Sequence, residues 1–197
     1  MKEYARLVGV LTLICLMSGT LLAWVHRVTE EPIREAKRRQ TLAALAKVLP
    51  PHDNQPDQHT VTLKDAEGEP ERLVYVATQD GSFAGAAWEM TTDQGYGGSI
   101  RIMIGVNREG KVQGIEILPG HRETPGLGAK IADNDFKAQF AGLSVRDTVW
   151  RLSGDGGAID AITAATVSSE AVVDAVAAGL AEYPDFEARL RAGADTP

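Results

Sequence analysis

The chain has 197 residues, enough for one domain of ordinary size with an appendage, and carries a formal net charge of -7. This acidic balance argues against nucleic acid as a partner, because phosphate binding needs a basic surface. The single cysteine, Cys15, excludes an internal disulfide and a metal site made of thiolates alone. The four histidines show no metal-ligand spacing, so we expect no metal.

The first feature along the chain is an uncharged apolar stretch, Leu7–Val25. As a helix it would span roughly 29 Å, close to the hydrocarbon thickness of a bilayer. It is longer than a signal-peptide core, and no small-x-small cleavage site follows it. We therefore interpret residues 1–26 as an uncleaved transmembrane anchor. The flanking basic residues do not decide its orientation.

A second helix is predicted over Thr29–Leu49, continuing from the membrane. Thr29 or Glu30 fits its start, Pro32 fits its first turn, and Pro50-Pro51 ends it. A polar, proline-rich connection follows, so residues 27–58 are grouped as a juxtamembrane helix and linker.

Two pairs of strand-like segments follow, each joined by a turn sequence. The segments are Arg72–Thr78, Phe83–Thr91, Ile100–Val106 and Val112–Leu118. Helices expected at Ala132–Phe140 and Glu170–Tyr183 would cover the sheet that these strands form. We predict an α+β domain over residues 59–197, with an antiparallel sheet covered by helices.

Two loops between these elements contain candidate site residues. Gln94–Ser99 holds three glycines that permit positive φ and close approach of a ligand, although a plain tight turn is the default interpretation. His121–Gly128 combines an acid, a hydroxyl and two glycines after a proline. Neither loop identifies a function by itself.

The third candidate stretch, Asp160–Thr166, runs into a helical apolar pattern, so Thr166–Ser169 lies where a loop becomes a helix. Such a point offers free N–H groups and the positive end of a helix dipole, which together bind anions. Serine and threonine before a helix are more often caps, and spacing alone favours that interpretation.

Taken together, three motifs resemble the FMN-binding domain shared by the RnfG subunit of Rnf complexes and the NqrC subunit of sodium-pumping NADH:quinone reductases. They are Gly95-Tyr-Gly-Gly98, Glu123-Thr-Pro-Gly-Leu-Gly128 and Asp160-x-x-Thr163-x-Ala165-Thr166. Leu21-Leu-Ala23 and Thr29-x-x-Pro32-Ile33 also resemble RnfG, so the resemblance covers nearly the whole chain. The short length and the lack of a large insertion favour RnfG over NqrC.

The resemblance implies that FMN is bound covalently, through its phosphate, to Thr166. A periplasmic flavin transferase would recognise the motif formed by Asp160, Thr163, Ala164, Ala165 and Thr166. Ala164 departs from the glycine common at this position, and alanine resists positive φ. Further FMN contacts are implied for Tyr96, Gly97, Gly98, Glu123, Thr124, Pro125, Gly126, Leu127, Gly128, Thr163 and Ala165.

The resemblance also implies a single-pass protein of the bacterial cytoplasmic (inner) membrane, with a cytoplasmic N-terminus and a periplasmic main domain. It would relay single electrons within Rnf, an ion-translocating ferredoxin/NAD oxidoreductase, beside other integral-membrane and cytoplasmic subunits. The chain has no GxGxxG fingerprint after a strand and no cluster cysteines, so other subunits would bind NAD or ferredoxin.

Two alternatives remain: an NqrC-like subunit of sodium-translocating NADH:quinone reductase, and a flavin-free, membrane-anchored assembly protein in which Thr166 is a cap.

Overall fold

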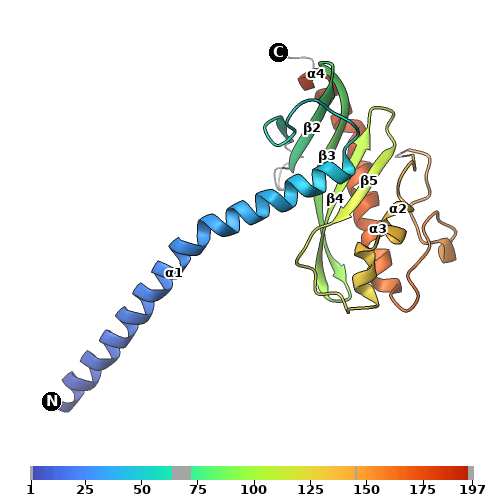
Figure 1. Cartoon of the computed structure of the whole chain (residues 1–197). Coiled ribbons are helices and arrows are strands. Elements are labelled where there is room, and N and C mark those ends of the chain that lie inside the picture. The colour runs from blue at the N-terminus through green and yellow to red at the C-terminus, as the bar shows by residue number, and fades with distance from the viewer. Residues whose placement is uncertain (1, 64–71, 145, 195–197) are drawn as a thin grey trace. The chain divides into compact units, whose positions relative to one another are not determined.

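The computed structural model describes residues 2–63, 72–144 and 146–194 (Figure 1). The chain forms two compact units, Met1–Thr41 and Leu42–Pro197. The first is helical. The second contains a sheet and its covering helices, together with the last turns of the N-terminal helix.

Helix α1 (Lys2–Val48) is continuous, so the predicted start of a second helix at Thr29 is wrong. The hydroxyl of Thr29 does not cap a helix but donates to the carbonyl oxygen of Val25 (2.8 Å). Pro32 lies inside the helix, and an ion pair such as Glu35–Arg39 (2.7 Å) supports the turns that follow it.

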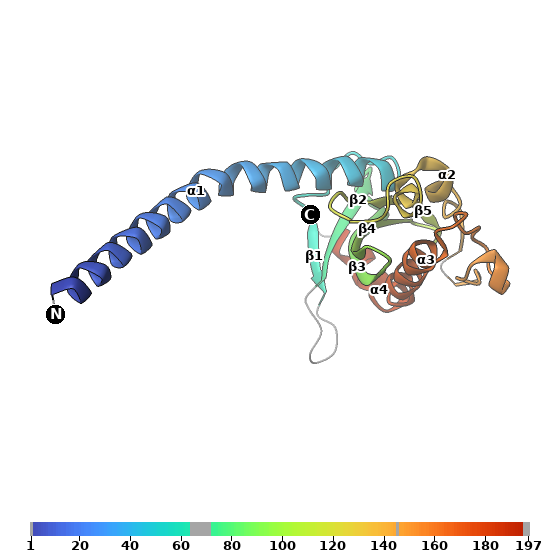
Figure 2. The same cartoon turned by 90° about the horizontal axis from the view of Figure 1, so that it is seen from below.

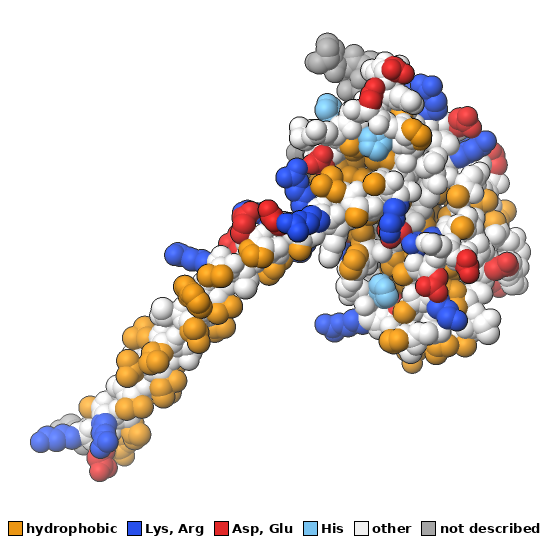
Figure 3. Space-filling model, in the orientation of Figure 1, with side chains coloured by type: hydrophobic (Ala, Val, Ile, Leu, Met, Phe, Trp, Pro, Cys, Tyr) orange, Lys and Arg blue, Asp and Glu red, His pale blue; other side chains and the backbone are white. Residues whose placement is uncertain are grey.

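By length and composition, α1 can cross a membrane, and its most apolar window is 0% buried. Figure 3 shows hydrophobic side chains along the N-terminal half of α1, with charged side chains at both ends of this stretch. An apolar helix surface without protein around it is suited to lipid. This finding fits a single-pass membrane protein.

Five strands form one antiparallel sheet in the order β1-β2-β3-β4-β5 (Figure 1). They are β1 (Thr60–Leu63), β2 (Arg72–Gln79), β3 (Ser82–Gly95), β4 (Gly98–Asn107) and β5 (Val112–Ile117). The four predicted strands are confirmed, and β1 is an addition. Strand β3 extends to Gly95, which pairs with Gly98, so the first glycine-rich loop is the tight turn of a long hairpin.

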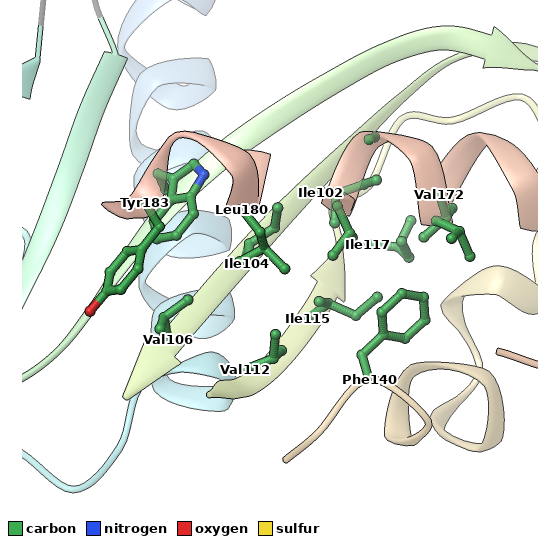
Figure 4. Packing of buried hydrophobic residues seen from close by; sticks show 14 of the residues in the cluster. Ile102, Ile104, Val106, Val112, Ile115, Ile117, Phe140, Val172, Leu180 and Tyr183 are labelled. Carbon is green, nitrogen blue, oxygen red and sulfur yellow. The ribbon is translucent and has the colours of Figure 1, made fainter. Parts of the chain in front are cut away.

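One face of the sheet packs against α3 (Thr166–Ala181) and α4 (Tyr183–Ala194). Alternation along β4 sends Ile102, Ile104 and Val106 into this core and Met103 to the opposite face. Figure 4 shows Ile102, Ile104 and Val106 gathered with Val112, Leu180 and Tyr183. The ring of Tyr183 stacks on buried Trp88 at a centroid distance of 6.0 Å.

The predicted helices exist with different bounds. Helix α3 starts at Thr166, before the predicted Glu170, because its polar first turn lacks the apolar pattern on which the prediction rests. The segment predicted as Ala132–Phe140 divides into the 3-10 helix η1 (Gly128–Ala132) and α2 (Asn134–Ala138), since Asp133 between them is extended. Helix α4 and the short η2 (Ser153–Asp155) were not predicted.

The last turns of α1 cover the other face of the sheet (Figure 2). Ala44, Leu45 and Val48 pack on small and apolar side chains of the strands. Gly105 makes this approach possible, because a Cβ at this position would overlap the Val48 carbonyl and lie 2.9 Å from the Val48 Cβ.

An ionic network joins α1 and α2 to β5. Lys47 and Lys137 both donate to the carboxylate of Glu116, with Nζ–O distances of 2.6 and 2.7 Å. Burial alone would raise the pKa of Glu116, but the hydrogen bonds from Lys137 and Lys47 outweigh it and hold this pKa below its ordinary value.

We expect Gly105→Ala to lower the free energy of unfolding by about 1–3 kcal/mol, because the new methyl group must displace α1 from the sheet. The matched control is Gly114→Ala on the neighbouring strand, where a Cβ would make ordinary contacts at 3.6 Å or more. This control should change stability by less than about 0.5 kcal/mol. Urea unfolding of the full chain in detergent micelles measures both, and equal losses would contradict the packing argument.

The Glu116 network predicts a pH-dependent stability difference. A lowered folded pKa contributes stability that is complete above the unfolded pKa of about 4.3 and is lost as the pH falls through the folded pKa. The gap in urea midpoint between wild type and Glu116→Gln should therefore be full near about pH 7 and should shrink as the pH falls below about 4.3 and through the folded pKa. A gap that persists in acid would show that the carboxylate's charge is not responsible. Glu109→Gln, which alters an exposed pair with Lys111, should produce little effect at either pH.

Candidate functional site

A cavity of about 550 Å³ lies where the three predicted motifs meet. Its walls come from the β3–β4 turn, the loop after β5, and the start of α3. The residues that line it are Tyr96, Glu123, Thr124, Leu127, Gly128, Ala164, Ala165, Thr166, Val167 and Ser168.

Helix α3 begins at this cavity without a side-chain cap. Ala165 occupies the N-cap position and makes no side-chain hydrogen bond, so the interpretation of Thr166 as a cap is wrong. Within the described chain, the N–H groups of Thr166, Val167 and Ser168 donate to no carbonyl or side-chain oxygen. Free N–H groups at the positive end of a helix dipole form an anion site.

Ser169 holds the preceding loop against the helix. Its hydroxyl oxygen accepts from the Ile162 N–H (3.0 Å), and the hydroxyl donates to the Ala165 carbonyl (3.0 Å). The hydroxyl of Thr166 is left exposed at the cavity. Ser169 therefore has a structural role, whereas Thr166 is exposed where the loop meets the cavity.

Glu123 is a buried acid in the cavity wall, with 5% of its surface exposed. Its Oε1 accepts from the Gly97 N–H (2.9 Å), and its Oε2 accepts from the Ser168 hydroxyl (2.5 Å). A Cβ at Gly128 would overlap both the carboxylate and the Ser168 hydroxyl, so glycine leaves the space that this contact needs.

The remaining predicted residues are not among those that line the cavity. Gly97 supplies the N–H that Glu123 accepts, while Gly98 and Gly126 adopt φ values of 100° and 78° in their turns. Pro125 and Thr163 are exposed. The backbone N–H of Asp160 donates to the side-chain oxygen of Gln139 (2.7 Å), which fixes the start of the loop.

Sequence reasoning missed Val167 and Ser168 as site residues because it interpreted the residues around them as helix caps. The sequence carries no direct signal for them, because the burial of Glu123, which creates the need for hydroxyl or N–H donors, is seen only in the structure.

The cavity combines its anion site with apolar surface. Tyr96, Leu127 and Val167 line it while remaining 75%, 42% and 51% exposed. Among the residues that the structure describes, no group of three His, Cys, Asp or Glu is placed to hold a metal ion. The arrangement suits a ligand that has an apolar part and an anionic group.

Comparisons with known proteins agree with this geometry. The FMN-binding domain family matches residues 95–181, which include all three motifs. The fold resembles the crystal structure of Shewanella oneidensis NqrC, with a TM-score of 0.51 at 19% identity, over 76% of this chain and 74% of that one.

Curated relatives match over most of the length of both proteins. The chain is 34% identical to the G subunit of the ion-translocating oxidoreductase complex of Shewanella piezotolerans, over 96% of this chain and 92% of that protein. It is 39% identical to the protein of the same name from Cereibacter sphaeroides, over 92% and 85%. The chain therefore belongs to the RnfG family, the G subunits of ion-translocating oxidoreductase complexes, and carries their FMN-binding domain.

Proposed function

We propose that this chain is a covalently flavinylated electron-transfer subunit of an Rnf complex, with FMN esterified through its phosphate to Thr166. Family membership and the FMN-binding domain support the electron-transfer role. One observation carries the assignment of the residue: the exposed hydroxyl of Thr166 lies at an uncapped helix terminus on the cavity wall.

Features of the cavity support binding of both the phosphate and the ring of FMN. Its volume of about 550 Å³ falls within the range of about 300–1,000 Å³ typical of small-molecule sites. The N–H groups of Thr166–Ser168 and the α3 dipole would stabilise the phosphodiester anion, the dipole by about 0.3–1 kcal/mol. Tyr96, Leu127 and Val167 would shield the ring from water. FMN supplies the redox-active ring, and the protein holds it in place.

Attachment requires the Thr166 hydroxyl to lose its proton as its oxygen bonds to phosphorus. The phosphorus must come from an activated flavin phosphate whose leaving group departs in the same exchange, and a periplasmic transferase would bring this donor. Asp160 and Thr163 are exposed in the loop that leads to Thr166, where such an enzyme can reach them. The covalent bond would keep the cofactor from being lost to the periplasm.

The apolar part of α1 would anchor the chain in the cytoplasmic membrane, with a cytoplasmic N-terminus and a periplasmic flavin domain. Partners would be the other integral-membrane and cytoplasmic subunits of the complex. Thr166 does not cap α3, and this counts against a flavin-free assembly protein. A threonine retained as a cap would accept a hydrogen bond from an N–H of the first helical turn.

Intact mass tests the attachment site. After expression with the flavin transferase, the wild-type chain should gain the mass of FMN minus one water and retain flavin fluorescence after denaturation. Thr166→Ala should carry no adduct, because it lacks the acceptor oxygen. The control Thr163→Ala keeps that oxygen, so modification remains possible and its adduct should be detected. An unmodified wild type would contradict covalent attachment, and loss of the adduct only in Thr163→Ala would move the site.

Backbone strain at Ala164, in the same loop, gives a prediction about stability. Its φ of 62° is left-handed, a conformation that costs an L-residue about 1–2 kcal/mol. Glycine removes this strain but adds about 0.4–1 kcal/mol of unfolded-state entropy cost. Ala164→Gly should therefore stabilise the protein by up to about 1.6 kcal/mol in urea unfolding.

The matched control for this strain is Ala161→Gly, at an exposed loop position whose φ is not positive. This change should cost about 0.4–1 kcal/mol, because only the entropy term remains. The same sign for both variants would show that Ala164 is not strained.

A further inference from the structure

The carboxylate of Glu123 connects two walls of the cavity that are distant in sequence. One oxygen accepts from Gly97 in the β3–β4 turn, and the other accepts from Ser168 in the first turn of α3. These contacts span 26 and 45 residues. Gly97 and Ser168 each hydrogen-bond to a different oxygen of this one carboxylate, so the carboxylate is the bridge between them.

The surroundings of Glu123 are shaped around this bridge. A Cβ at Gly95 would lie 2.6 Å from Oε1, and one at Gly128 would overlap Oε2. Gly97 approaches so closely that a Cβ there would overlap the Arg122 carbonyl. A buried carboxylate is costly unless it is hydrogen-bonded, so the turn and the helix are both held to it.

We infer that Glu123 is a positioning residue, which holds the β3–β4 turn against α3 and thereby sets the distance between the Tyr96 wall and the N–H groups of Thr166–Ser168. In this role its oxygens bind protein donors rather than the cofactor. Like-charge repulsion points the same way, because a carboxylate aimed at the cofactor's phosphate would oppose its binding. The cofactor part of this inference rests on the proposed function, and the bridge itself does not.

Four variants separate the bridge from the charge. Glu123→Ala removes both hydrogen bonds. Glu123→Gln removes the charge but keeps an oxygen for Gly97 and offers an N–H₂ group to the Ser168 oxygen, as weaker neutral bonds. Ser168→Ala removes only the helix end of the bridge. The control, Glu109→Ala, removes an exposed carboxylate in the turn after β4, at the opposite end of that strand from Gly98.

The first measurement uses the full chain without flavin, in detergent micelles, and follows hydrogen–deuterium exchange at the Gly97 amide. Exchange should accelerate on the order of 10- to 100-fold in Glu123→Ala, less than about tenfold in Glu123→Gln, and not in Glu109→Ala. Ser168→Ala leaves the bond to Gly97 in place, so it should accelerate exchange less than Glu123→Ala does. Wild-type exchange in Glu123→Ala would overturn the bridge, whatever the flavin does. If Glu123→Ala fails to fold, the Glu123→Gln and Ser168→Ala proteins decide the same question.

The second measurement places each variant on a Thr166→Ala background and titrates free FMN by quenching of its fluorescence. Glu123→Ala should weaken FMN binding at least about tenfold, while Glu123→Gln restores most of the affinity because the bridge survives. Faster Gly97 exchange with unchanged FMN affinity would overturn the positioning role. Tighter binding in Glu123→Gln would also overturn it, by showing that charge dominates. If the Thr166→Ala protein itself binds no free FMN, the adduct yield of each variant with Thr166 intact replaces the affinity, and an unchanged yield in Glu123→Ala would overturn the positioning role.

Discussion

The pairing register of β3 with β4 is the constraint that positions the other elements. The two strands are matched from Gly85 with Asn107 to Gly95 with Gly98. Near one end, Gly105 admits the last turn of α1, and at the other end the turn reaches Glu123. Between them, Met90 of β3 packs against α3 at Gly179. Because side chains alternate along a strand, a shift of one residue would turn the core face outward and remove all of these contacts together.

Two local rules of protein stability are broken within three residues of each other, at the start of α3. A helix whose N-cap residue is alanine lacks the cap that serine or threonine would supply, at a cost of about 0.5–2 kcal/mol. Ala164 adds backbone strain just before it. Hydroxyl residues are plentiful here, so the sequence had the means to cap this helix. Violations that local stability does not require are expected where function sets the geometry, and they coincide with the cavity.

The sequence predicted the two hairpins of the sheet well because each hairpin is specified by residues that are close together in the chain. Alternating apolar residues and the turns at Gln79–Ser82 and Asn107–Gly110 identify the strands of both hairpins. Continuity of α1 was not predictable in the same way, since Pro32 fits a helix start as well as a helix interior that lacks one N–H. The packing of Val48 on Gly105 brings together two segments that are far apart in the sequence, and the pattern of neither segment predicts contact with the other.

The same distinction between local and long-range information applies to the site. Its three motifs are recognisable as sequences, and the structure brings residues of all three to one cavity. The contact that joins two of them, between Glu123 and Ser168, links residues 45 positions apart through a hydroxyl whose local pattern is that of a helix cap. No periodicity reports such a pair. What remained hidden was therefore the tertiary bridge, and not the identity of the motifs.

The bridge also explains how one helix terminus can serve two anions. Glu123 is a fixed negative group at the first turn of α3, and the proposed phosphate would be a second one close to it. Glu123 takes its hydrogen bond from the Ser168 hydroxyl, so it leaves the N–H groups of Thr166, Val167 and Ser168 unused. The two negative groups are thus assigned to different donors, which limits their repulsion at the same dipole. A hydroxyl at position 168 is what permits this separation, because alanine there would leave the buried carboxylate to compete for the N–H groups that the ligand needs.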